Sequence, residues 1–210
     1  MNKHIYDQLL ELSVYCMRFA EVNRATSNLD GITPESDTDH TVMLGIVGCA
    51  FAARLAPELN LGKIAQFALV HDFTEVITGD VDTLMPFDAS EKALKEKEAL
   101  ETLRTLFGNV PWLHTTMQEY ESLASPEARF VKVLDKVLPK ITQLASNGKT
   151  LTARGMGSWD LKVFMDKQFN SIVNSYGFDQ PAVMDFAKDM SERLLNMMIS
   201  KEINNDTTSH

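Results

Sequence analysis

The stretch "LGKIAQFALVHDFTEVITGD", residues 61–80, joins an apolar segment to a cluster of ionisable side chains. Apolar residues recur at three- and four-residue spacing in its first half, which predicts a helix, and Gly79 is a typical residue to end it. His71, Asp72 and Glu75 continue the helical spacing, so their side chains should project from one face. A chain rarely buries such groups unless they are paired or bind a metal.

The rest of the chain shows the same helical periodicity. Ser36 offers an N-cap with Asp39 three positions later, the spacing of a capping box, so a helix should run from there to about Ala56. We expect further helices over residues 5–22, 90–108, 113–124, 126–145, 159–173 and 181–203, with polar loops over residues 23–35 and 146–158. The sequence therefore predicts an all-α protein, a single helical bundle with a C-terminal helical extension. Residues 1–203 should form the domain, and residues 204–210 a disordered tail.

Composition limits the range of functions. The 210 residues are 44% hydrophobic and 23% charged, which is ordinary for a globular protein with a sizeable core. The formal net charge of −9 repels a phosphate polymer, so binding of nucleic-acid polymers is disfavoured. A small phosphorylated ligand stays compatible with this charge, because a few cations can be concentrated locally.

Cysteine usage and hydropathy indicate where the protein works. Cys16 and Cys49 both lie inside apolar helical patterns, which predicts two buried thiols, no disulfide and a reducing compartment. The N-terminal residues lack the uninterrupted apolar core of a secretory signal. The longest uncharged stretch, residues 41–53, is too short to cross a bilayer. We expect a soluble protein of the cytoplasm, or of a host cytoplasm if the chain is viral, with no membrane partner.

Ionisable residues elsewhere can join the cluster at residues 71–75. His40 lies in the first turns of its predicted helix on the apolar side, and Asp135 flanks the apolar stripe of residues 131–138. Two imidazoles and two carboxylates from three helices could therefore converge, which is the composition of a metal site. Mixed nitrogen and oxygen ligands suit zinc, cobalt, manganese or iron and do not decide among them. Glu75, one turn further, could orient water or move its proton.

Each of these residues also has a purely structural interpretation. A lone histidine on an apolar face, such as His40, is more often a satisfied core residue than a ligand. Asp135 alone would be a charge on a helix surface. The metal-site prediction therefore depends on the whole set.

The combined pattern resembles a known family. "ESDTDH" (35–40), "HDFTEVITGD" (71–80) and "RFVKVLDK" (129–136) together resemble the HD-domain metal-dependent phosphohydrolases. The extended form, HD-x-x-E-x-x-x-x-D, is similar to the compact 5′-deoxynucleotidases and to the related phage dATP triphosphohydrolases. The resemblance covers about residues 5–150, with a motif core at about 20–150.

The resemblance implies a role for each matching residue. It makes His40, His71, Asp72 and Asp135 the ligands of a divalent metal, for which magnesium is a further option. It implies that Glu75 acts on the hydrolytic water and that Asp80 contacts the sugar or a second metal.

Arg24 and Lys132 match cations that hold substrate phosphate in this family. For both, a surface ion pair or a solvated charge is the alternative. The family's arginine is followed by tryptophan, whereas this chain has Ala25 and Thr26, so sugar and base preference stay open. Residues 147–155 add Lys149 and Arg154, which could meet a longer phosphate chain or belong to an ordinary polar loop.

These features predict a phosphohydrolase that cleaves the 5′ phosphate ester of a deoxynucleotide and releases the deoxynucleoside. The alternatives are cleavage of the same bond in a deoxynucleoside triphosphate such as dATP, a non-catalytic nucleotide sensor, and a structural bundle with a coincidental motif. We also expect a homo-oligomer, at least a dimer. Residues 194–200, "LLNMMIS", are too apolar for a solvent-facing helix, and the family resemblance implies assembly.

Overall fold

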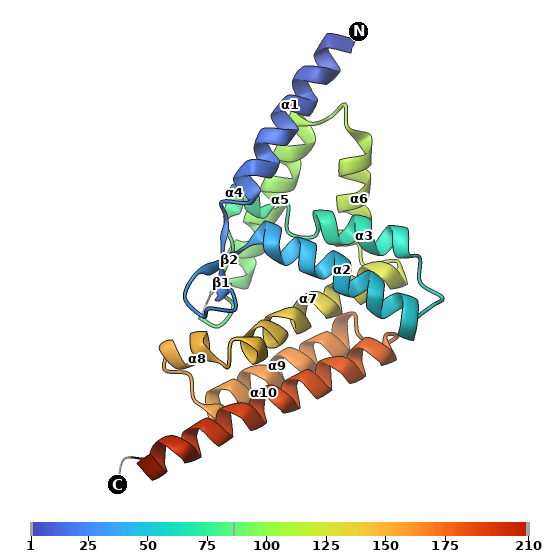
Figure 1. Cartoon of the computed structure of the whole chain (residues 1–210). Coiled ribbons are helices and arrows are strands. Elements are labelled where there is room, and N and C mark those ends of the chain that lie inside the picture. The colour runs from blue at the N-terminus through green and yellow to red at the C-terminus, as the bar shows by residue number, and fades with distance from the viewer. Residues whose placement is uncertain (1, 86, 209–210) are drawn as a thin grey trace. The chain divides into compact units, whose positions relative to one another are not determined.

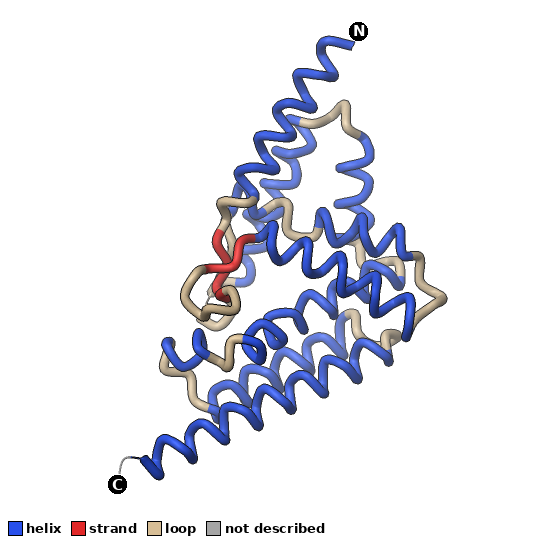
Figure 2. The backbone as a smooth tube through the Cα atoms, viewed as in Figure 1, coloured by secondary structure: helices blue, strands red, loops and turns tan. Residues whose placement is uncertain are grey.

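The computed structural model describes residues 2–85 and 87–208, and most of them are helical (Figure 1 and Figure 2). The elements in chain order are α1 Asn2–Phe19, β1 Asn23–Ser27, β2 Pro34–Ser36, α2 Asp37–Leu55, α3 Leu61–Val70, α4 Glu75–Thr78, α5 Ala89–Leu106, α6 Pro111–Glu121, α7 Pro126–Ala145, α8 Lys149–Ala153, α9 Ser158–Ser175 and α10 Pro181–Thr208. The two strands pair in one small sheet, placed where a loop was expected. The predicted all-α class is confirmed.

The chain separates into two compact units. The first contains Met1–Ala25 and Glu35–Ala128, and the second contains Thr26–Pro34 and Arg129–His210. The boundary passes through β1, through β2 and through the first turn of α7. This division is finer than the single domain expected from the sequence, and the domain limits of 1–203 stay a prediction.

The first unit is built on the capped start of α2. The hydroxyl of Ser36 accepts a hydrogen bond from the backbone N–H of Asp39 at 3.1 Å, and the Asp39 carboxylate accepts one from the Ser36 N–H at 3.2 Å. This reciprocal pair is the predicted capping box, and it fixes where the helix begins. Behind it, α2 packs on α3 around fully buried Leu44, Ile64 and Phe67.

The segment after α3 differs from the expected continuous helix. Helix α3 ends at Val70, and a turn precedes α4, in which the Glu75 N–H bonds to the carbonyl three residues earlier at 2.8 Å. Three-residue bonds tighten the chain relative to an α-helix. The tightened turn buries Phe73, whose ring meets Phe19 edge-on at 5.5 Å between centroids. Gly79, at φ +71°, ends α4 as predicted.

The second unit consists mainly of α7, α8, α9 and α10. Helices α9 and α10 pack together, and Leu161 and Leu194 are buried in this unit. The predicted loop at 146–158 contains the short helix α8, which Gly148 introduces with φ +62°. A side chain at this glycine would collide with Met198, since a Cβ there would lie 2.9 Å from the sulfur.

Three further predictions, on the C-terminal tail, the two cysteines and membrane spans, can be compared with the structure. Helix α10 continues to Thr208, so the predicted tail is helical up to that residue, and residues 209–210 lie outside the described residues. Cys16 is exposed and Cys49 half-buried, which contradicts the prediction of two buried thiols because both lie on outward parts of their helices. Among the described residues, no helix is both long and apolar enough to cross a membrane.

Candidate metal centre

Six of the eight predicted site residues belong to the first unit. They are Arg24, His40, His71, Asp72, Glu75 and Asp80. The segments that carry them are β1, the first turn of α2, and the turn and short helix that follow α3. Apolar Leu44, Val70 and Phe73, which lie close to these residues in the chain, are buried, so the polar groups lie against the core of the unit.

His40, His71 and Asp72 form the centre of this cluster. Each offers one ligand atom, and these atoms lie within 4.8 Å of one another. The two imidazole centroids are 5.3 Å apart, and both histidines are at least 96% buried. Two ring nitrogens and a carboxylate oxygen at this separation are a donor set for a divalent metal ion.

The hydrogen bonding of His71 supports this assignment. Its Nδ1 lies 2.8 Å from the carbonyl oxygen of Ala68, which can only accept, so Nδ1 carries the proton. In the neutral ring, Nε2 then presents a lone pair, and it faces the Asp72 Oδ2 at 2.9 Å. Two lone pairs at this distance repel unless a proton or a cation lies between them. A carbonyl-oriented histidine beside a carboxylate is the usual environment of a metal ligand.

A second group of carboxylates adjoins the first. Asp37, Asp72 and Glu75 also offer ligand atoms within 4.8 Å of one another. Arg24 bridges two of them, with its Nη1 at 2.9 Å from the Asp37 Oδ1 and 2.7 Å from the Asp72 Oδ2. One guanidinium thus faces three carboxylates, which leaves the cluster short of positive charge.

The raised pKa values of Glu75 and Asp37 agree with this shortage of positive charge. Burial, together with the neighbouring carboxylates of Asp72 and Asp37, raises the pKa of Glu75 to about 10. Burial also raises the pKa of Asp37 to about 6, although Arg24 opposes the shift. Within the described part of the chain, Asp37 Oδ2 and Glu75 Oε2 are buried without a hydrogen-bond partner. Buried orphan oxygens and excess negative charge are what a bound cation relieves, so the residues present fit a divalent metal.

Asp80 lies at the edge of this cluster. It follows Gly79, and its Oδ2 accepts a hydrogen bond from the backbone N–H of Ala25 at 3.1 Å. The bond ties the end of α4 to β1, next to Arg24. The half-buried carboxylate of Asp80 therefore lies beside Arg24 and near the carboxylates, and its contact with a sugar or a second metal stays a prediction.

The remaining two predicted residues lie in the second unit, on α7. Asp135 is 1% exposed, and Lys136 Nζ contacts its Oδ2 at 2.7 Å. Lys132, half-buried, lies three residues earlier on the same helix. Their participation in a site with the first unit stays a prediction. Lys149, also in the second unit, donates to the backbone carbonyl of Asp30 at 2.8 Å.

Two buried acids were missed from the sequence. Asp37 is 0% exposed, and Glu35, 3% exposed, places its Oε1 at 3.7 Å from the His40 Nδ1. Acidic residues at a helix start ordinarily interact with its dipole from the surface, so their type gave no reason to place them inside. Glu35 lies inward in β2 between exposed Pro34 and half-buried Ser36. The sequence predicted a loop there, so this alternation became visible only in the structure.

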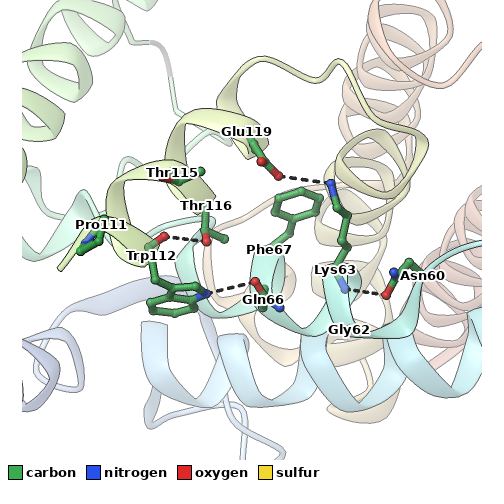
Figure 3. A pocket seen from close by; sticks show the side chains of 10 residues that line it. All are labelled: Asn60, Gly62, Lys63, Gln66, Phe67, Pro111, Trp112, Thr115, Thr116 and Glu119. Atoms are coloured by element: carbon green, nitrogen blue, oxygen red, sulfur yellow. Dashed lines mark hydrogen bonds and ion pairs between the residues drawn. The ribbon is translucent and has the colours of Figure 1, made fainter.

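The first unit also has a pocket apart from this cluster. It lies between α3 and α6, has a volume of about 520 Å³, and contains none of the predicted site residues (Figure 3). Its polar groups pair with one another: Trp112 Nε1 donates to Gln66 Oε1 at 3.0 Å, and Lys63 Nζ lies 3.3 Å from Glu119 Oε2. We assign no chemistry to this pocket.

The fold and the cluster define an all-α protein with a buried His/Asp centre suited to a divalent metal. The family model described as "HD domain" matches residues 17–174, and the chain belongs to this family. Membership agrees with the motif "HDFTEVITGD" and with the helical architecture.

Curated relatives and solved structures extend the comparison. The chain is 33% identical over 105 residues to 5′-deoxynucleotidase HDDC2 of Bos taurus, an alignment covering 49% of this chain and 50% of the relative. It is 33% identical over 112 residues to 5′-deoxynucleotidase hdd1 of Schizosaccharomyces pombe, covering 49% and 54%. The chain thus matches about half the length of these relatives.

Two crystal structures share the fold. A predicted metal-dependent phosphohydrolase from Magnetospirillum magnetotacticum has a TM-score of 0.73 at 20% identity, over 91% of this chain and 93% of that one. The PH0347 protein of Pyrococcus horikoshii has a TM-score of 0.63 at 22% identity, over 88% and 99%. Identities this low establish similarity of fold alone.

Proposed function

We propose that this protein is a metal-dependent phosphohydrolase that cleaves the 5′ phosphate ester of deoxynucleoside monophosphates and releases the deoxynucleoside. The observation that carries the proposal is that the buried His40 and His71 and the half-buried Asp72 offer ligand atoms within 4.8 Å of one another, beside the Arg24 guanidinium. A metal-binding donor set next to a cation fits an anionic phosphate. The names of the curated relatives, 5′-deoxynucleotidases, supply the substrate class.

The metal would be held by His40, His71 and Asp72, with Asp135 as the fourth ligand. Burial of Asp135 and its place in the family motif support this assignment. Zinc, cobalt, manganese, iron and magnesium all accept such nitrogen and oxygen donors. When bound, a divalent ion supplies Lewis acidity and lowers the pKa of water.

The other residues would bind the substrate and move protons. A bound cation would favour the ionised form of Glu75, which is buried beside Asp72. Its unpartnered Oε2 would then accept a proton from the hydrolytic water. Arg24 would bind the phosphate by exchanging one of its two carboxylate partners for the substrate, and Lys132 would add a second cation. Asp80, fixed by the Ala25 N–H, would contact the sugar.

A second candidate is the same bond broken in a deoxynucleoside triphosphate such as dATP, with triphosphate released. One feature favours it: α8 adds Lys149, with Arg154 directly after it. Ala25 and Thr26, which stand where the family's nucleotidases have a tryptophan, leave sugar and base preference open. Additional cations suit a longer phosphate chain, because its charge is greater.

Product analysis separates the candidates. Purified protein would be incubated with each divalent metal and with deoxy- and ribonucleoside mono- and triphosphates, and the deoxynucleoside, phosphate and triphosphate released would be quantified. Deoxynucleoside from monophosphates alone is the expected result. Triphosphate release from dATP would support the second candidate. Tight nucleotide binding without turnover under any metal would overturn both in favour of a nucleotide sensor.

We also propose a cytoplasmic location and a homo-oligomer of at least two copies. The two free cysteines, one of them exposed, suit a reducing compartment. The segment expected to mediate assembly, residues 194–200, is partly occupied within its own unit, since Leu194 and Met198 are buried. Ile199 of the same segment is 38% exposed, so its part in assembly stays a prediction.

A further inference from the structure

Helix α1, drawn in dark blue in Figure 1, has apolar side chains on two opposite faces. One face packs on its own unit: the ring of Tyr15 meets Phe107 edge-on at 5.2 Å between centroids, and Phe19 meets Phe73 at 5.5 Å. The other face is exposed. A single helix that serves one core needs only one apolar face, so the second face calls for a separate explanation.

The exposed face is a continuous stripe. Tyr6 is 62% exposed, Leu10 67%, Val14 38% and Met17 67%, with Leu9, at 46%, beside them. The first four are spaced by four, four and three residues, which aligns them along one side of the helix. We call these five residues the outer stripe. Exposed apolar side chains gathered in this way mark an interaction surface, whereas scattered ones do not.

We infer that the outer stripe is the contact between two copies of this chain, with the two α1 helices antiparallel. The stripe is nearly symmetric about its middle: Tyr6 and Met17 are its ends, and Leu10 and Val14 flank its centre. In a two-fold antiparallel pair, Tyr6 of each copy meets Met17 of the other, and Leu10 meets Val14. A surface that complements itself in this way fits a second copy, because a two-fold interface uses the same patch on both partners.

The charges bordering the stripe agree with this arrangement. Asp7 and Arg18 are eleven positions apart, about three full helical turns, so they lie along the same edge of α1. When Tyr6 faces Met17 of the second copy, Asp7 of each copy comes beside Arg18 of the other. The antiparallel pair therefore contains two contacts between Asp7 of one copy and Arg18 of the other. In a parallel pair the edge that carries Asp7 and Arg18 would face the opposite edge of the partner helix, so neither of these contacts between opposite charges would form.

The size of the stripe sets the expected strength of the contact. A stable interface removes about 800 Å² of surface from each partner. Five side chains on one helix supply less than that, so the dimer should dissociate on dilution unless neighbouring surface contributes. This inference rests on the homo-oligomer proposed above, and it does not depend on the hydrolytic activity.

Sedimentation velocity of the full chain at increasing protein concentration tests the stripe. We expect a concentration-dependent monomer–dimer equilibrium for the wild type. The double substitution Leu10→Glu/Met17→Glu should weaken the dimer at least tenfold and leave the circular-dichroism spectrum and the melting temperature unchanged, because both side chains are exposed. The matched control is Ile32→Glu, which places the same charge at an 83% exposed apolar residue outside the stripe and should leave the equilibrium unchanged.

A charge exchange tests the antiparallel orientation. Asp7→Arg and Arg18→Asp should each weaken the dimer, because each variant brings like charges together, and the combined variant should regain wild-type assembly. Monomer at all concentrations overturns the inference. A dimer that persists unchanged in the Leu10→Glu/Met17→Glu variant also overturns it, and indicates that the copies associate through another surface. Failure of the combined charge variant to recover, when both single variants dissociate, overturns the antiparallel arrangement.

Discussion

Arg24 and Asp37 form a buried ion pair that joins β1 to the first turn of α2, with 2.9 Å between Nη1 and Oδ1. The Asp37 side chain is 0% exposed and that of Arg24 is 11% exposed. The same Nη1 also contacts Asp72 at 2.7 Å, so one guanidinium compensates a buried and a half-buried carboxylate. Removing a single partner from such a pair leaves a buried charge without compensation, which is more costly than losing the pair as a whole.

Substitution of Arg24 by alanine should destabilise the metal-free protein by about 3–5 kcal/mol, because Asp37 and Asp72 would face each other without a cation. Urea unfolding monitored by circular dichroism measures the change. Arg104→Ala is the matched control: Arg104 is exposed and pairs with Glu101 at 3.0 Å, so its loss should cost about 0–1 kcal/mol. Equal effects of the two substitutions would contradict the importance assigned to the buried pair.

Chelation should lower the melting temperature of the protein as purified, and readdition of a divalent metal should restore it. The ion binds the folded state, so it stabilises by about 2.7 kcal/mol when its concentration is one hundred times Kd. His71→Gln should abolish both the shift and the bound metal, measured by mass spectrometry of the ions. His114→Gln is the control, since His114 bonds to the Phe107 carbonyl away from the cluster. A melting temperature that changes neither with chelator nor with added metal would rule out the ligand assignment.

Glu75→Gln should lower turnover of the best nucleotide by about 10²–10⁴-fold, because glutamine cannot accept the proton of water. Metal content should stay at the wild-type value, since Glu75 is placed on the water and not on the ion. Initial rates and metal analysis of the same preparation test both statements. Wild-type turnover in the glutamine variant would show that another group takes the proton.

Lys140 should make stability pH-dependent in the alkaline range. Burial lowers the pKa of Lys140 from 10.5 to about 8, and its Nζ donates to the Lys136 carbonyl at 2.9 Å and to Gln168 Oε1 at 2.6 Å. Between about pH 8 and pH 10.5 the unfolded chain therefore carries a proton that the folded chain lacks. Unfolding takes up that proton, so the free energy of unfolding rises with pH across this window. The stability gained from the neutral Lys140 is lost as pH falls through about 8.

Urea unfolding at several pH values measures this contribution, which has a limiting slope of about 1.4 kcal/mol per pH unit. Lys140→Met should remove the rise. Lys162→Met, at a half-exposed lysine paired with Asp166, should keep it. A Lys140→Met profile parallel to that of the wild type would contradict the lowered pKa.

Local signals in the sequence were sufficient for most of the long helices and for the motif. The capping box of Ser36 and Asp39 depends on hydrogen bonds within four residues, and Gly79 ends its helix through its own backbone freedom. Helical periodicity is likewise a property of one segment, so the all-α class followed from it. The spacing of His71, Asp72 and Glu75 marked the candidate site before any packing was known.

Only the tertiary structure decided which polar groups are buried and how they face one another. Asp37 looks like a surface residue at a helix start, yet Arg24, thirteen residues earlier, holds it inside. Packing of Phe73 on Phe19 accompanies the turn that replaces a continuous helix after Val70. Cys16 fits an apolar pattern and is nevertheless exposed, since α1 uses one face for its core and leaves another outside. Burial and ion pairing depend on segments distant in the chain, and the free energy of those contacts is not encoded in any single window of sequence.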